Sequence, residues 1–156
     1  MNSKYEISTK ENREFLKASC EELLNFGHRF PSPNGGSYYL GDDGTPWKDR
    51  NRETWITCRM AHVYSLGLML GHEGSGELAD AALKGLKGEL HDEKNGGWYA
   101  GVTPEGDIVP NKQCYAHAFV ILAASSALTA GRPGAKELLE EALAVYDRHF
   151  WNEEEG

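Results

Sequence analysis

The sequence contains little cysteine and no pattern that binds a metal. Its three cysteines, Cys20, Cys58 and Cys114, are scattered and odd in number. No CxxC or HExxH motif is present, so we expect no metal site. Because all three cysteines fall within helical patterns, we expect buried free thiols in a reducing compartment, and therefore a cytoplasmic protein.

Positive charge and long apolar runs are also scarce. Lysine and arginine total 16 against 24 aspartates and glutamates, which gives a formal net charge of −8. Nucleic-acid binding needs clustered positive side chains, so we expect no nucleic-acid partner. No run approaches the ~20 apolar residues of a membrane span, and the polar N-terminus lacks the apolar core of a signal peptide. The 156 residues, 40% of them hydrophobic, suit a soluble domain with a real core.

What the sequence does contain is an internal repeat. The segments Trp55–Gly71 (WITCRMAHVYSLGLMLG) and Tyr115–Gly131 (YAHAFVILAASSALTAG) lie sixty residues apart. Each starts on an aromatic residue, continues for about four turns as an apolar helix, and stops on glycine. The flanks repeat at the same offset, with Leu83 matching Leu143. This period suits one helical hairpin plus a large loop.

The pattern along the chain predicts five helices. They are expected at about Lys10–Gly27, Arg52–Leu70, Gly76–Leu90, Lys112–Thr129 and Gly134–Phe150. The two loops that precede the second and fourth helices each carry Gly-Gly, then aromatic residues, then a turn of glycine and acidic residues, which predicts a short β-hairpin in each loop.

The distribution of charge among these helices predicts an all-α toroid. The second and fourth helices are almost wholly apolar, so we expect them to be buried on all sides, whereas the third and fifth carry a charged face. A ring of inner helices within an outer ring follows. The array stops without a cap inside a third copy of the loop, so we expect residues 1–156 to be the N-terminal part of one domain that continues beyond Gly156.

Polar residues on the first turns of the inner helices are the candidates for a binding site, because these turns meet at one mouth of the ring. Arg59 is unusual in so apolar a helix and must either form an ion pair, with Glu53 or Asp49, or reach a polar cavity. Trp55 and Tyr115 occupy equivalent repeat positions, where they either stack on a sugar or simply pack.

Three further polar residues are weaker candidates. His62 lies one turn beyond Arg59, where a buried histidine hydrogen-bonded to a neighbouring loop is the alternative to a catalyst. Gln113 and His117 are four residues apart and either line the mouth or hydrogen-bond the helix end. The acids near the mouth, Asp49 and Glu53, form no convincing pair, which is evidence against a glycoside hydrolase.

With these motifs in place, the chain resembles the N-acylglucosamine 2-epimerase superfamily, and most closely its aldose–ketose isomerase branch of mannose and sulfoquinovose isomerases. The matching segments are Trp55–Tyr64 (WITCRMAHVY), Asn95–Ala100 (NGGWYA), Lys112–Phe119 (KQCYAHAF) and His149–Glu155 (HFWNEEE). The resemblance implies an (α/α)6 barrel, of which this chain holds about five of twelve helices.

The resemblance also implies a reaction. It is a 1,2-proton transfer through a cis-enediol that interconverts mannose or a related hexose with its ketose or 2-epimer, without metal, nucleotide or other cofactor. Arg59, Trp55 and Tyr115 match substrate-contacting positions. The two acid–base histidines are expected after Gly156, so this segment contains no catalytic residue and is expected to be inactive alone.

Two other functions remain open from the sequence. The chain could be a non-catalytic carbohydrate-binding or interaction module, or part of another (α/α)6 enzyme such as a glycoside hydrolase or a lyase. The sequence does not indicate the oligomeric state of the whole protein, but the isolated segment is expected to self-associate, because its inner helices lack the partners that close the ring.

Overall fold

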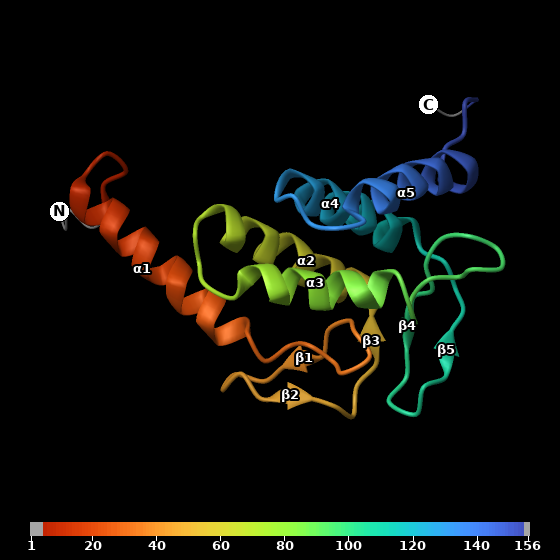
Figure 1. Cartoon of the computed structure of the whole chain (residues 1–156), viewed down its shortest axis with the longest axis horizontal. Coiled ribbons are helices and arrows are strands. Elements are labelled where there is room, and N and C mark those ends of the chain that lie inside the picture. The colour runs from red at the N-terminus through yellow and green to blue at the C-terminus, as the bar shows by residue number, and fades with distance from the viewer. Residues whose placement is uncertain (1–4, 155–156) are drawn as a thin grey trace.

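The computed structural model describes residues 5–154 and is built mainly from helices (Figure 1). In chain order the helices are α1 (Lys10–Gly27), α2 (Thr54–Met69), α3 (Ser75–Leu86), α4 (Cys114–Thr129) and α5 (Ala135–Phe150). After Phe150 the backbone becomes extended at Trp151, where the third loop was predicted to begin; residues 155–156 of that predicted loop lie outside the described part.

Each of the two loops contains a pair of short antiparallel strands, as the sequence predicts. In the first loop, β1 (Tyr39–Leu40) pairs antiparallel with β2 (Pro46–Trp47). In the second, β4 (Gly101–Val102) pairs with β5 (Ile108–Val109). The sequence did not predict that β3 (Arg52–Glu53) would pair with β4 and so join the two loops in one three-stranded sheet.

The sixty-residue repeat is confirmed in both ends of the inner helices and in the starts of the outer ones. Helices α2 and α4 begin at residues 54 and 114 and end at residues 69 and 129, while α3 and α5 begin at residues 75 and 135. The glycines that end the inner helices, Gly71 and Gly131, have φ of 81° and 68°, a left-handed conformation that glycine adopts without strain.

Three predicted helix boundaries were wrong. Helix α4 starts at Cys114 rather than Lys112, whose side chain pairs with Asp92 before the helix begins. Helix α2 starts at Thr54 because Arg52 and Glu53 pair with β4 as a strand instead. Helix α3 ends at Leu86 rather than Leu90, because the chain reverses there and the Leu90 amide donates to the carbonyl of Gly85. Gly85 also packs directly against the first loop, and a Cβ at this position would lie 2.3 Å from the amide nitrogen of Gly36.

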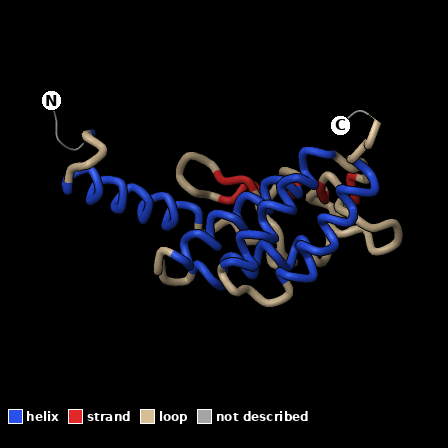
Figure 2. Tube along the Cα trace, turned by 90° about the horizontal axis from the view of Figure 1, so that it is seen from above, coloured by secondary structure: helices blue, strands red, loops and turns tan. Residues whose placement is uncertain are grey.

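The helices form two layers that follow the predicted inner and outer arrangement. Helix α2 packs against both α3 and α4, and α4 packs against α5, while α1 extends away from this group (Figure 2). Alanines dominate the contact surfaces and allow the helices to approach closely. The fully buried ones are Ala61, Ala79, Ala82, Ala116, Ala123, Ala124 and Ala127.

The expectation that α2 and α4 are buried on all sides was wrong for this chain. One side of α2 and the facing side of α1 remain exposed, with Leu23 at 71% and Leu70 at 72% of full exposure. Val63 and Leu66 extend this apolar face, which is hollowed by a cavity of about 180 Å³ beside Leu24 and Gly67. No described element covers these side chains.

We predict that the 156-residue chain self-associates when it is expressed alone, because contiguous apolar surface of this kind drives association. Sedimentation velocity should show oligomers, and Leu70→Ser, which makes the face polar, should increase the monomer fraction. The matched change Leu143→Ser, on the exposed side of α5, should have a smaller effect. A monomeric wild-type chain with a sharp thermal transition would contradict the prediction.

The cysteines follow the sequence expectation only in part. Cys58 is fully buried and Cys20 is half-buried, but Cys114 is exposed because it is the first residue of α4 and does not face the core. Burial raises the pKa of the Cys58 thiol well above its usual value. None of the helices in the described part of the chain is long and apolar enough to cross a membrane.

Candidate functional site

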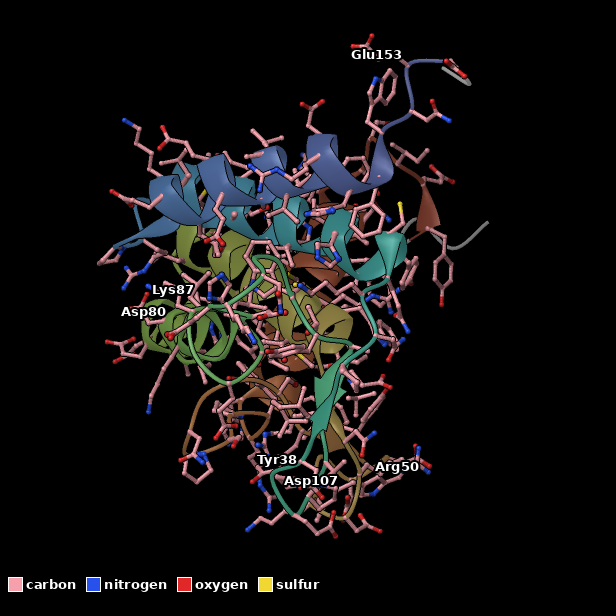
Figure 3. The ribbon with its side chains drawn as sticks, turned by 90° about the vertical axis from the view of Figure 1, so that its right-hand side faces the viewer. Tyr38, Arg50, Asp80, Lys87, Asp107 and Glu153 are labelled. Carbon is pink, nitrogen blue, oxygen red and sulfur yellow. The ribbon has the colours of Figure 1, made fainter. Side chains whose placement is uncertain are left out.

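The first turns of α2 and α4 lie at the end of the molecule that carries the strands. β3 leads directly into α2, and β5 precedes α4 by a few residues. Figure 3 shows Arg50 and Asp107, from the two loops, at this same end, away from α5. The predicted mouth of the ring therefore exists in the described residues as a surface where two helix N-termini and two hairpin loops meet.

The start of α2 is held by both loops. The Thr54 amide donates to the carbonyl of Ala100 (3.0 Å) and its hydroxyl donates to the carbonyl of Tyr99 (2.6 Å). One turn later the Thr57 hydroxyl accepts from the amide of Ser37 (3.0 Å). Both threonines are fully buried, so the first turn of α2 has a fixed position relative to the loops.

Asp92 organises the second loop and ties it to the start of α4. Its carboxylate accepts from the amide and side chain of Asn95 and lies 2.8 Å from the ammonium of Lys112, two residues before α4. The Lys112 ammonium and the Asn95 bonds hold the pKa of this carboxyl well below its usual range. The loop and α4 are therefore joined by a charge-assisted contact next to Tyr115.

The residues of the two repeats meet in one cluster at this mouth. The rings of Trp55 and Tyr115, which are equivalent in the repeat, lie 6.0 Å apart. The Arg59 guanidinium lies 4.8 Å from the centre of the Trp55 ring and 5.1 Å from that of Phe119, its own repeat equivalent. Its Nη2 is 3.5 Å from the Tyr115 hydroxyl. We name Trp55, Arg59, Tyr115 and Phe119 the mouth cluster.

The ion pair considered for Arg59 is not formed. Within residues 5–154 no carboxylate lies within 4.0 Å of its guanidinium, and the side chain is exposed. Aromatic faces stabilise it from two sides by cation–π contact instead. Several guanidinium N–H groups therefore remain available to a ligand, and the Tyr115 ring beside them is 54% exposed.

Sequence reasoning missed one member of the site, Tyr39, and named Glu53 only as a possible partner of Arg59. The Tyr39 hydroxyl of β1 and the Trp55 indole Nε1, at 2.7 Å, both donate to the same carboxylate oxygen of Glu53. Burial, followed by the bond to Glu53, raises the pKa of Tyr39 above its usual value, so the phenol stays a donor. The sequence contained no signal for this arrangement, because only folding of the first loop brings Tyr39 next to α2.

His117 lies away from the mouth, although the sequence allowed it to line that surface. It is 1% exposed, and its Nε2 accepts from the amide of Trp98 (3.1 Å) while Nδ1 donates to the carbonyl of Gln113 (2.8 Å). The ring also packs against Phe150 of α5. The helix-end hydrogen bond, the alternative interpretation, is the one observed, and it leaves neither ring nitrogen free.

Gln113 and His62 also form structural contacts. Gln113 precedes α4 as its N-cap residue, is exposed, and uses its carbonyl to bind His117. The Nδ1 of His62 lies 2.7 Å from the Ser126 hydroxyl, which itself donates to the carbonyl of Leu122. The histidine therefore donates to Ser126 and links α2 to α4. The hydrogen bond considered for His62 is formed, but to a neighbouring helix rather than to a loop, and the side chain is half-buried rather than buried.

We predict that His117 makes folding stability fall in mild acid. Burial lowers the pKa of His117 below its usual value, so the unfolded chain binds the proton more readily than the folded one. The stability is complete above the unfolded pKa of about 6.5 and is lost as the pH falls below it. Unfolding midpoints measured between about pH 7 and pH 5 should decrease, and His117→Gln should flatten this dependence.

The control for this prediction is His149→Gln, since His149 is exposed at the end of α5. That variant should keep the wild-type slope of stability against pH. An equal slope in wild type and His117→Gln would show that another group is responsible. The loss of folding stability expected from protonation of Asp92 begins at lower pH, as the pH falls below the usual carboxyl pKa of about 3.9. The effects of His117 and Asp92 therefore occur in different pH ranges.

No metal-binding cluster accompanies these residues. Within residues 5–154, no three His, Cys, Asp or Glu side chains gather closely enough to hold a metal ion. What the site offers is a half-open surface of aromatic faces with guanidinium and hydroxyl donors at its centre. Aromatic rings suit the apolar faces of a sugar ring, and the donors suit its oxygens.

Comparison with known proteins identifies the family. The sequence profile of N-acylglucosamine 2-epimerase (GlcNAc 2-epimerase) matches residues 35–156. The D-mannose isomerase of Thermobifida fusca is 41% identical over 146 residues, which cover 93% of this chain and 36% of that protein. The D-mannose isomerase of Pseudomonas cannabina pv. alisalensis is 37% identical over 150 residues, which cover 96% of this chain and 36% of that protein.

Solved structures show the same fold. A D-mannose isomerase crystal structure superposes with a TM-score of 0.81 at 24% identity, over 96% of this chain and 38% of that one. The cellobiose 2-epimerase of Bacillus thermoamylovorans B4167 gives a TM-score of 0.76 at 25% identity, over 92% of this chain and 39% of that one.

The helical hairpins and the mouth between them are therefore those of a partial (α/α)6 barrel, as the sequence predicted. The chain belongs to the N-acylglucosamine 2-epimerase family, and its curated relatives place it in the mannose isomerase branch. It spans little more than a third of the length of these relatives, 36% in both cases.

Proposed function

We propose that this chain supplies part of the sugar pocket of an aldose–ketose isomerase acting on mannose or a related hexose. The observation that carries the proposal is the mouth cluster, in which an arginine without a carboxylate partner in the described residues stands between aromatic rings. The D-mannose isomerases among its relatives support this substrate class.

In this proposal Arg59 and the aromatic rings bind different parts of the sugar. Trp55 and Tyr115 stack against the apolar face of the sugar, while Arg59 donates hydrogen bonds to the oxygens on C1 and C2. A proton leaves C2, giving a cis-enediolate, and a proton is returned to C1 to give the ketose. Negative charge develops on the two oxygens at that stage, which is where a fixed guanidinium stabilises most.

We further propose that residues 1–156 form part of a single barrel domain, and that the acid–base histidines lie outside them. The histidines nearest the mouth cluster in sequence support this division. His62 and His117 each engage a ring nitrogen in a structural hydrogen bond, and His117 is fully buried. The segment alone is therefore expected to catalyse no exchange.

The test uses a protein that contains this segment at the full length of its relatives. It is incubated with D-mannose, other hexoses and cellobiose in D₂O, and loss of the C2 proton is followed by NMR. We expect exchange at C2 of mannose or a close relative, with a ketose as product. Sugar binding without any exchange would indicate a non-catalytic module, and cleaved products would indicate a hydrolase or lyase; either result overturns the proposal.

A further inference from the structure

One carboxylate connects the first loop to the mouth cluster. Glu53 is the last residue of β3 and the residue immediately before α2, and it is half-buried. Its Oε2 accepts from the Tyr39 hydroxyl and from the indole Nε1 of Trp55, the latter at 2.7 Å. The rings of Tyr39 and Trp55 also meet edge to face, with centroids 6.4 Å apart.

These two bonds determine where the Trp55 ring lies. An indole has a single donor, and here a charged acceptor two residues earlier holds it. Glu53 itself is held from one side by the pairing of β3 with β4 and from the other by Tyr39. The bond therefore transmits the position of the loops to the first turn of α2.

Trp55 in turn supports Arg59. The guanidinium lies 4.8 Å from the centre of the indole, and the centroid of the Tyr115 ring lies 6.0 Å from that of the Trp55 ring. Since Glu53 is not ion-paired with Arg59 within the described residues, its charge holds Trp55 and leaves the guanidinium available.

We propose that Glu53 is a positioning residue for the sugar site: it fixes the Trp55 ring and, through that ring, the Arg59 guanidinium. This inference rests on the proposed function, because it assumes that Trp55 and Arg59 face a sugar. It differs from a purely stabilising role in that the loss of Glu53 changes sugar affinity through Trp55, not only through the fold.

The test uses the full-length protein labelled with 5-fluorotryptophan, in which Trp55→Phe assigns the Trp55 resonance. Glu53→Gln should shift that ¹⁹F resonance and weaken D-mannose binding, measured by titration of the same signal, by about tenfold. Thermal unfolding of each variant shows whether it is folded. Trp55→Phe keeps a ring but removes the donor, so its mannose affinity, measured by calorimetry, should fall similarly.

Combining the two changes gives the sharpest result. Because Trp55→Phe already removes the bond, Glu53→Gln in that background should change the affinity by about twofold or less. Asp49→Asn is the matched control, since it removes an exposed negative charge near the start of α2 and should leave both the resonance and the affinity unchanged.

Each outcome distinguishes this inference from the proposed function. An unshifted Trp55 resonance in Glu53→Gln, unchanged mannose affinity, or fully additive effects of the two changes would overturn the positioning role. The proposed function fails separately, if the wild-type protein exchanges no C2 proton of any sugar while the resonance and affinity respond as described.

Discussion

Replacing Arg59 with alanine should lower kcat/KM for the sugar by about 10²–10³-fold in the full-length protein, the range seen when one donor to a developing oxyanion is removed. The main effect should fall on kcat, because the proposed function places the guanidinium at sugar oxygens whose charge grows in the enediolate. Steady-state isomerisation at several sugar concentrations gives kcat and KM separately, and C2 exchange measured by NMR reports the proton transfer itself.

The fold should survive this change. Arg59 is exposed and forms no ion pair within the described residues, so its removal leaves no buried charge unpaired. Unfolding midpoints should therefore agree with wild type. Arg148→Ala, which removes an exposed guanidinium on the outer helix α5, is the matched control and should retain full activity. Equal activity in Arg59→Ala and wild type would exclude the role assigned to Arg59.

Replacing Trp98 with alanine should destabilise the protein by about 3–5 kcal/mol, the range for truncating a fully buried large aromatic side chain. Trp98 is 0% exposed, and its indole donates to the carbonyl of Leu86 at the end of α3 (2.7 Å). Its ring also contacts the rings of His91 and His117. The change would leave a cavity and an unpaired carbonyl where the second loop, α3 and α4 meet.

Denaturant unfolding of the full-length protein measures this loss, with Trp47→Ala as the matched control. Trp47 is 39% exposed and contacts the guanidinium of Arg50 at the surface of the first hairpin, so its truncation should destabilise much less. The destabilisation by Trp98→Phe should lie between those of Trp98→Ala and Trp47→Ala, since phenylalanine keeps most of the ring volume but loses the donor. Similar losses for Trp98→Ala and Trp47→Ala would show that the second loop is not part of the stable core.

Much of the fold could be predicted because local sequence patterns define each helix of the repeat. An apolar run that begins on Trp55 or Tyr115 and stops at Gly71 or Gly131 defines a helix and its end through propensity and φ > 0 alone. The boundaries that failed were at Arg52, Leu90 and Lys112. The pairing of β3 with β4 overrode local preference at Arg52, and the bridge between His91 and Trp98 did so next to Leu90. The Lys112 side chain forms an ion pair with Asp92 of the second loop.

The site was predictable to the same extent. Trp55, Arg59 and Tyr115 share a helix face or a repeat position, so their proximity follows from helical geometry and symmetry. His117 shows the limit of that reasoning, because two residues from Tyr115 the same first turn faces the opposite way, into Trp98 and α5. Sequence spacing gives the angle between two side chains around a helix, but it does not show which side of the helix faces the mouth.

The sequence by itself determined the helical repeat, the family and the aromatic and arginine residues at the inner helix starts, because these depend on local periodicity and residue chemistry. Only the tertiary structure decided that Arg59 is stabilised by aromatic rings rather than by an acid, and that Glu53 binds Trp55 and Tyr39 instead. The physical reason is that a carboxylate can pair with any donor within reach, and the folding of distant loops determines which donors are within reach.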